Sequence, residues 1–135
     1  METTEKNLVF IVDDNPAYAK MLNTFLLKAI PNLKTKIFST GEACLHEMYL
    51  SPMAIVLDYY LDAKFEYAWN GIQILKKLLS KDPALNVIVI SAQENIEIAL
   101  NCIKEGAIEY IIKNEKTLPE IQKLLLNVID DAVEY

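Results

Sequence analysis

Five ionisable or hydroxyl side chains stand at the carboxyl ends of short apolar runs in the sequence. They are Asp13 and Asp14 after a first run, Asp58 at the end of a second, Ser91 after a third and Lys113 after a fourth. Short, continuous apolar runs rich in β-branched residues predict strands that are buried on both faces. In open α/β sheets, ligands bind at the carboxyl ends of the strands. We therefore expect the five side chains to meet at one edge of a sheet.

Crowded carboxylates limit the chemistry that this edge can perform. Three neighbouring aspartates would repel one another and raise one another's pKa values unless they shared a cation. Sites with only oxygen ligands favour a hard divalent ion, and Mg²⁺ uses few carboxylates while keeping several waters. An aspartate nucleophile at Asp58, with Mg²⁺, the Lys113 ammonium and the Ser91 hydroxyl, would make an acceptor site for a phosphoryl group.

Each of these residues also has an ordinary structural explanation when it is taken singly. Asp14 can cap a following helix, and Ser91 is a common residue between a strand and a loop. A lone lysine such as Lys113 is usually solvated. Their joint placement at the ends of four separate apolar runs is what favours a functional site.

The elements that would position these residues can be placed from periodicity and turn residues. Apolar or alternating runs predict strands at 8–12, 34–38, 53–57, 86–90 and 109–112. Helical spacing predicts helices from Asn15-Pro16 to Pro31, over 42–50, from Gly71 to 81, over 94–105, and from Thr117 almost to Tyr135. Strands that alternate with helices indicate an α/β fold with a parallel sheet covered on both faces. Because no repeat or linker interrupts the pattern, we expect one domain over residues 1–135.

The composition fits a compact domain and argues against several classes of partner. The chain has 135 residues, 53% of them hydrophobic and 24% charged, and a formal net charge of -6. A nucleic-acid-binding face needs an excess of basic residues, and no apolar run approaches the roughly 18 residues that span a bilayer. The amino terminus is polar and unlike a signal peptide, and Cys44 and Cys102 lack metal-ligand spacing, as is typical of buried thiols in a reducing compartment. We expect a cytoplasmic protein that binds neither nucleic acid nor membrane.

The motifs at the strand ends resemble those of the response-regulator receiver domains of two-component signal transduction. The resemblance covers nearly the whole chain and rests on Val12-Asp13-Asp14-Asn15, Leu57-Asp58, Ser91-Ala92 and the segment 106–113, Gly-Ala-Ile-Glu-Tyr-Ile-Ile-Lys. It implies a flavodoxin-like (βα)5 three-layer sandwich with a parallel five-stranded sheet of order 2-1-3-4-5.

The resemblance also implies a role for each acidic residue at the edge. Asp58 would be the phosphoacceptor, modified from the phosphohistidine of a sensor histidine kinase or a phosphotransfer protein. Asp13 and Asp14 would hold Mg²⁺, together with Asp58 and the backbone carbonyl of Tyr60.

Three further residues would connect the phosphoryl group to the rest of the domain. Ser91 would bond the phosphoryl oxygens, Lys113 would pair with them, and Tyr110 would swing inward as Ser91 moves. Phosphorylation would then shift a two-state equilibrium that a downstream target or effector domain reads at a distant face.

The chain departs from the family pattern at three places. Asn114 stands where the family usually has a proline after the lysine, which leaves the geometry of this loop open. An insertion over 62–70 carries Phe65, Tyr67 and Trp69, which would form a partial lid or docking ridge, or would pack the longer loop onto its own helix. Tyr60 is bulky where an attacking water approaches, so we expect slow self-dephosphorylation.

Other functions fit these residues less well than a switch that catalyses only its own phosphorylation and dephosphorylation. A hydrolase of the aspartyl-phosphate kind would normally need an acid–base aspartate where the chain has Tyr60. A flavodoxin-type electron carrier would need a phosphate cradle in place of Asp13-Asp14. A degenerate receiver that serves as a scaffold without phosphorylation stays open because of Asn114.

Two surface features complete the prediction. His46, the single histidine, is expected to be solvated on the second helix. The last helix carries more apolar residues than one buried stripe needs, and Leu126 and Val133 are left over. On the preceding helix, Ile98 falls at an expected outward position. These would form scattered apolar surface or a homodimer or target surface on that side of the domain.

Overall fold

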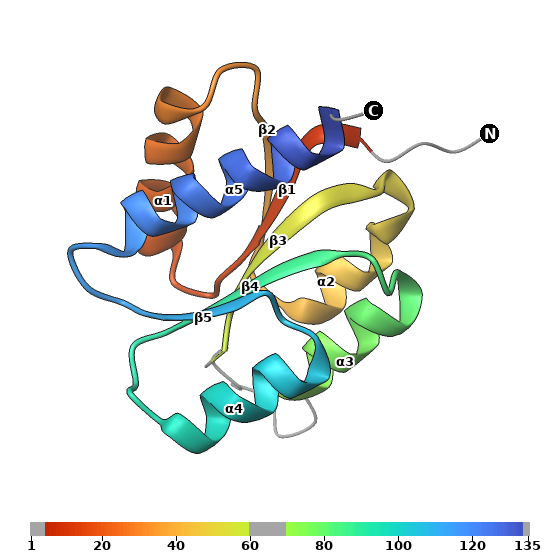
Figure 1. Cartoon of the computed structure of the whole chain (residues 1–135), viewed down its shortest axis with the longest axis vertical. Coiled ribbons are helices and arrows are strands. Elements are labelled where there is room, and N and C mark those ends of the chain that lie inside the picture. The colour runs from red at the N-terminus through yellow and green to blue at the C-terminus, as the bar shows by residue number, and fades with distance from the viewer. Residues whose placement is uncertain (1–4, 60–69, 134–135) are drawn as a thin grey trace.

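A computed structural model of the chain, which describes residues 5–59 and 70–133, contains a parallel five-stranded sheet between two layers of helices (Figure 1). The strands are β1 (Glu5–Val12), β2 (Lys34–Phe38), β3 (Pro52–Asp58), β4 (Asn86–Ser91) and β5 (Glu109–Ile112). The helices are α1 (Pro16–Ala29), α2 (Gly41–His46), α3 (Gly71–Lys81), α4 (Ile96–Glu105) and α5 (Thr117–Val133), with a 3-10 helix η1 (Met48–Leu50) after α2. The strand order is β2-β1-β3-β4-β5 and every pair is parallel, so the predicted flavodoxin-like topology is confirmed.

The sheet separates two hydrophobic cores because its central strands are apolar on both faces. All seven residues of β3 are buried, and alternate residues of the strand enter opposite cores. Ala54 and Val56 face α1 and α5, where the partners include Leu22, Leu26, Ile121 and Leu125. Ile55 and Leu57 face α2, α3 and α4, where the partners include Cys44, Ile74, Leu75, Leu78 and Cys102. The ends of the strands are therefore held on a rigid platform.

The ends of two helices differ from the prediction for reasons of local chemistry. The helix expected over 42–50 ends at His46 and continues as η1, and Ser51 then has a left-handed backbone ahead of Pro52. A residue before proline is disfavoured in the α conformation, so the helix cannot continue there. The helix expected from 94 begins at Ile96, because the side chain of Asn95 accepts the amide of Ile98 and caps it.

The outward apolar positions of α4 are not the predicted ones. Ile98 packs against the core under α4, so its expected outward place is wrong, and the exposed side chains are Ile96 at 75%, Leu100 at 65% and Ile103. On α5, Leu126 is exposed as predicted, while the side chain of Val133 lies outside the described residues.

The predictions of an exposed His46 and of two buried cysteines are confirmed. His46 is exposed at the end of α2. Cys44 and Cys102 are free and buried, and burial raises the pKa of their thiols to about 12 and about 11, which keeps them protonated. Within the described ranges, no helix combines the length and apolar character needed to cross a membrane.

Candidate functional site

Three aspartates meet at the carboxyl edge of the sheet because β1 and β3 are neighbours. Val12 pairs with Leu57, which places the residues that follow these two positions side by side. Asp13, Asp14 and Asp58 each offer a carboxylate oxygen, and these oxygens lie within 4.8 Å of one another. Asp13 is 2% and Asp58 5% exposed, while Asp14 is half-buried. In the part of the chain that the structure describes, no other group of three or more acidic, histidine or cysteine side chains is close enough to hold a metal ion.

Lys113 reaches this cluster from the end of β5. Its Nζ donates a hydrogen bond to Asp58 Oδ2 at 3.2 Å and lies 3.7 Å from Asp13 Oδ2. The backbone amide of Lys113 donates to the Ser91 carbonyl at 2.8 Å, which continues the pairing of β5 with β4 and aims the side chain along the edge. The structure thus brings together four of the five side chains that the sequence placed at this edge.

Asp13 is electrostatically the most constrained member of the cluster. Its Oδ1 accepts the Asn15 amide at 2.9 Å, whereas Oδ2 is buried and accepts no hydrogen bond. Burial raises the pKa of Asp13 to about 6, and the negative charge of Asp58 adds to this rise. The Asn15 hydrogen bond and the positive charge of Lys113 lower the pKa and offset part of the rise. A buried carboxylate oxygen without a donor is an unsatisfied ligand for a cation.

Ser91 and Tyr110 are joined to each other through the backbone of Gln93. The Ser91 hydroxyl is buried; it accepts the Gln93 amide at 3.0 Å and donates to the Gln93 carbonyl at 3.3 Å. The Tyr110 hydroxyl donates to the same carbonyl at 3.2 Å, and the tyrosine packs against the core beneath α4. Ser91 therefore ends a strand at the predicted edge, but its hydroxyl bonds to the β4–α4 loop and not to the acids.

The loop after Lys113 is fixed by hydrogen bonds that a proline could not make. The Asn114 amide donates to Thr117 Oγ1 at 2.8 Å, and the Asn114 side-chain oxygen accepts the Lys116 amide at 2.7 Å. Thr117 is buried, and its hydroxyl donates to the Ile112 carbonyl at 3.1 Å. The described peptide bonds are all trans. Asn114 thus supplies an ordered turn into α5 in place of the usual proline.

Tyr18 is a member of the site that the sequence did not identify. Its ring lies under Lys113, with Nζ 4.1 Å from the ring centroid. Burial raises the pKa of Tyr18, and the charges of Asp13 and Asp58 add to the shift. The available signal was its position: Tyr18 is the third residue of α1, and the first turn of that helix follows directly on Asp13-Asp14.

The insertion falls mostly outside the described residues. The Tyr60 carbonyl and the side chains of Phe65, Tyr67 and Trp69 belong to the part of the chain that is not described. Its last residue, Asn70, caps the start of α3: the Asn70 side chain accepts the Gln73 amide and the Gln73 side chain accepts the Asn70 amide, a capping box.

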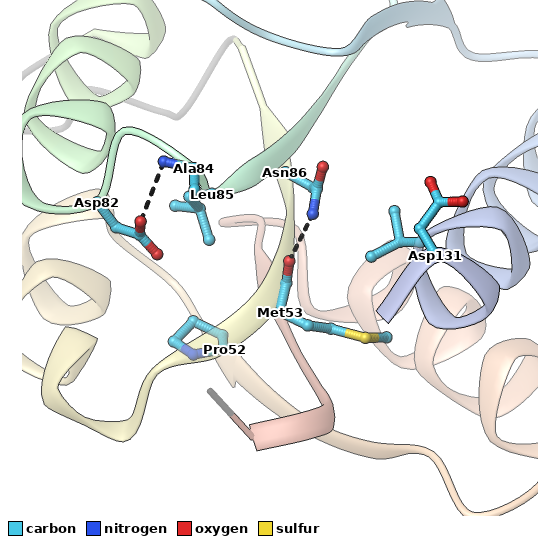
Figure 2. A pocket seen from close by; sticks show the side chains of 8 residues that line it. Pro52, Met53, Asp82, Ala84, Leu85, Asn86 and Asp131 are labelled. Atoms are coloured by element: carbon cyan, nitrogen blue, oxygen red, sulfur yellow. Dashed lines mark hydrogen bonds between the residues drawn. The ribbon is translucent and has the colours of Figure 1, made fainter. Parts of the chain in front are cut away.

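A pocket of about 360 Å³ lies at the opposite, amino-terminal edge of the sheet (Figure 2). It is lined by Pro52, Met53, Asp82, Ala84, Leu85, Asn86, Val128 and Asp131. The polar groups that border it bond to their neighbours: Ala84 donates to Asp82 Oδ1 at 3.1 Å, and Asn86 donates to the Met53 carbonyl at 3.1 Å. Its acids have neither the burial nor the close grouping of the carboxyl-edge cluster.

The fold and this cluster agree with the comparison to known families. The response regulator receiver domain family matches residues 9–125. The chain belongs to this family, and the domain is a receiver domain of a two-component response regulator.

Individual relatives are similar to this chain over most of its length. The transcriptional regulatory protein MalR of Bacillus subtilis is 33% identical over 109 residues, which are 78% of this chain and 43% of that protein. The chemotaxis protein CheY of Thermotoga maritima is 29% identical over 105 residues, 78% of this chain and 83% of that protein. The receiver domain of the response regulator NarL from Mycobacterium tuberculosis superposes with a TM-score of 0.75 at 25% identity, covering 93% of this chain and 98% of that one. The chain spans less than half the length of MalR and of several other regulatory proteins that it matches.

Proposed function

We propose that this receiver domain is a phosphorylation-dependent switch and that Asp58 is its phosphoacceptor. One observation carries the proposal: the Asp58 carboxylate is buried at the end of a core strand, grouped with two more carboxylates and hydrogen-bonded to Lys113. Burying an ionised group is costly unless it is paired or used. As phosphoryl donor we propose the phosphohistidine of a sensor kinase or of a phosphotransfer protein. In the transfer, an Asp58 oxygen bonds to phosphorus as the bond from phosphorus to the imidazole nitrogen breaks.

The acids fit Mg²⁺ as the resident cofactor. Asp13, Asp14 and Asp58 provide only oxygen ligands, which suit a hard divalent ion. Asp13 Oδ2 is buried, accepts no hydrogen bond and lies 3.7 Å from the Lys113 ammonium, so a bound cation would supply it with a ligand bond. When bound, Mg²⁺ supplies charge neutralisation for the phosphoryl oxygens. Because bound positive charge favours the ionised form of Asp13, ion binding near pH 6 is coupled to proton release.

The response to phosphorylation follows from the bonds of Lys113, Ser91 and Tyr110. Lys113 already contacts the acceptor oxygen and would pair with the phosphoryl oxygens. To bond the phosphoryl group, the Ser91 hydroxyl must release Gln93, whose carbonyl also holds Tyr110. Because Ser91 and Tyr110 donate to the same Gln93 carbonyl, loss of the Ser91 bond would change how Tyr110 is held. A partner that binds the β4–α4 loop would sense this change.

The test is phosphorylation by acetyl phosphate in the presence of Mg²⁺, followed by intact-protein mass. We expect the wild-type protein to gain one phosphoryl group and Asp58→Asn to gain none. Asp131→Asn, an exposed aspartate beside the opposite-edge pocket, is the matched control and should behave as wild type. Modification that persists in Asp58→Asn would disprove the assignment of Asp58. A wild-type protein that is never modified would instead favour a scaffold that works without phosphorylation.

A further inference from the structure

We propose that Tyr18 is a positioning residue for phosphoryl transfer: its aromatic ring holds the Lys113 ammonium at Asp58, a role that rests on the proposed phosphorylation of Asp58. The ring supplies a neutral partner for the ammonium in addition to the two carboxylates. Tyr18 acts through Lys113 and is not itself a nucleophile, acid or base in the transfer.

The geometry places Lys113 Nζ among three partners. The nitrogen is 3.2 Å from Asp58 Oδ2, 3.7 Å from Asp13 Oδ2 and 4.1 Å from the centroid of the Tyr18 ring. An ammonium group has three hydrogens to share among acceptors. A cation within about 6 Å of an aromatic centroid is attracted by the negative face of the ring, more strongly where water is excluded. The Lys113 side chain is only 18% exposed, so the ring contact is largely shielded from solvent.

Tyr18 is itself tied to the acid cluster by the first turn of α1. Asp13 Oδ1 accepts the Asn15 amide, and Asn15 Oδ1 accepts the Tyr18 amide at 3.1 Å. Pro16, at the first position of the helix, restricts the backbone between them. The ring is half-buried and packs against the core under α1 and α5. The position of the ring is thus fixed relative to the same aspartate that Lys113 contacts.

An aromatic ring has an advantage over the two carboxylates as an anchor. Phosphorylation of Asp58 changes the charge and the contacts of the two carboxylates. Their attraction for the Lys113 ammonium therefore changes as well. The face of the ring carries no ionisable charge and does not compete for a cation or a phosphoryl group. The lysine stem is long and flexible, so a constant partner keeps the ammonium near the acceptor oxygen throughout the transfer.

The experiment compares Tyr18→Leu, which removes the ring, with Tyr18→Phe, which keeps it. In the unphosphorylated protein, the ε-methylene protons of Lys113, assigned by their loss in Lys113→Arg, should show an upfield ring-current shift in wild type and Tyr18→Phe. Tyr18→Leu should abolish this shift. The rate of phosphorylation by acetyl phosphate should fall about fivefold in Tyr18→Leu, within the roughly 2- to 30-fold range that cation–π energies allow, and should stay near wild type in Tyr18→Phe.

Two controls separate this role from general packing. Tyr49→Leu alters a tyrosine that is 70% exposed on η1 and should leave both readouts unchanged. In a Lys113→Ala background, Tyr18→Leu should slow phosphorylation no further, because its effect passes through the lysine. Equal rates for wild type and Tyr18→Leu, or an equal loss in Tyr18→Phe, would overturn the positioning role alone. A wild-type protein that takes no phosphoryl group at Asp58 would overturn the proposed function and the positioning role together, and the ring-current shift would still report whether the contact exists.

Discussion

Both edges of the sheet carry aspartates, but the aspartates at the two edges differ in burial and in their bonding partners. At the carboxyl edge, Asp13 and Asp58 are buried, both contact Lys113, and Asp13 Oδ2 has no hydrogen bond. At the amino edge, Asp82 ends α3 and accepts the Ala84 amide, while Asp131 is exposed (Figure 2). An aspartate of the second kind supports a turn or is simply solvated. Burial of Asp13, with Oδ2 left without a hydrogen bond, costs stability, and this cost is what the proposed cation would relieve.

The largest expected contrast between the edges is in the binding of divalent ions. Asp13→Asn should weaken Mg²⁺ binding at least about tenfold, because it removes a full charge and an unsatisfied ligand oxygen. Isothermal titration calorimetry at neutral pH would measure the affinity. Asp82→Asn, the same change at the other edge, should leave the affinity at the wild-type value. Equal affinities for wild type and Asp13→Asn would remove Asp13 from the proposed metal site.

The second contrast is the dependence of stability on pH in the absence of divalent ions. The pKa of Asp13 is 3.8 when unperturbed and about 6 in the fold. The folded state thus binds this proton more tightly, and the resulting stability is complete below pH 3.8 and is lost as the pH rises through about 6. The loss is at most roughly 3 kcal/mol, because each pH unit between the two pKa values contributes about 1.4 kcal/mol.

Chemical denaturation in the presence of a chelator, at a series of pH values, would measure this loss. Asp13→Asn should flatten this part of the profile and be the more stable protein at pH 7, whereas Asp82→Asn should keep the wild-type profile. Saturating Mg²⁺ should restore much of the stability of the wild-type protein. A flat wild-type profile between pH 4 and 7 would contradict the electrostatic cost assigned to Asp13.

Much of the carboxyl edge could be predicted from the sequence because its determinants are local. The run 53–57 is apolar without interruption, so its strand had to be buried on both faces, and Asp58 had to stand at its end. Parallel strands then bring Asp13, Asp58 and Lys113 to one edge whatever their separation in the chain. The order of the strands came from the family resemblance, and the structure confirms it.

The parts that could not be predicted depend on the rotation of a helix about its axis and on contacts between side chains and loops. Helical spacing suggested an outward Ile98, but α4 packs on the sheet with Ile98 toward the core and leaves Ile96 exposed. The helical spacing of the α1 segment does not mark the ring of Tyr18 as part of the site. Only the structure shows Lys113 over its face and Ser91 bonded to Gln93.

The smallest expected effect is a loss of stability at the amino edge, opposite in sign to the gain expected for Asp13→Asn at the carboxyl edge. Asp82→Ala removes the acceptor of the Ala84 amide in the turn between α3 and β4, and should lower the free energy of unfolding by about 1 kcal/mol or less. Urea denaturation at pH 7 would measure it, with phosphorylation by acetyl phosphate unchanged. Loss of a carboxylate would then destabilise the protein at the amino edge and stabilise it at the Asp13 position. If both substitutions destabilised the ion-free protein, the carboxyl-edge acids would support the fold as Asp82 does, and the inference from their burial to a bound cation would fail.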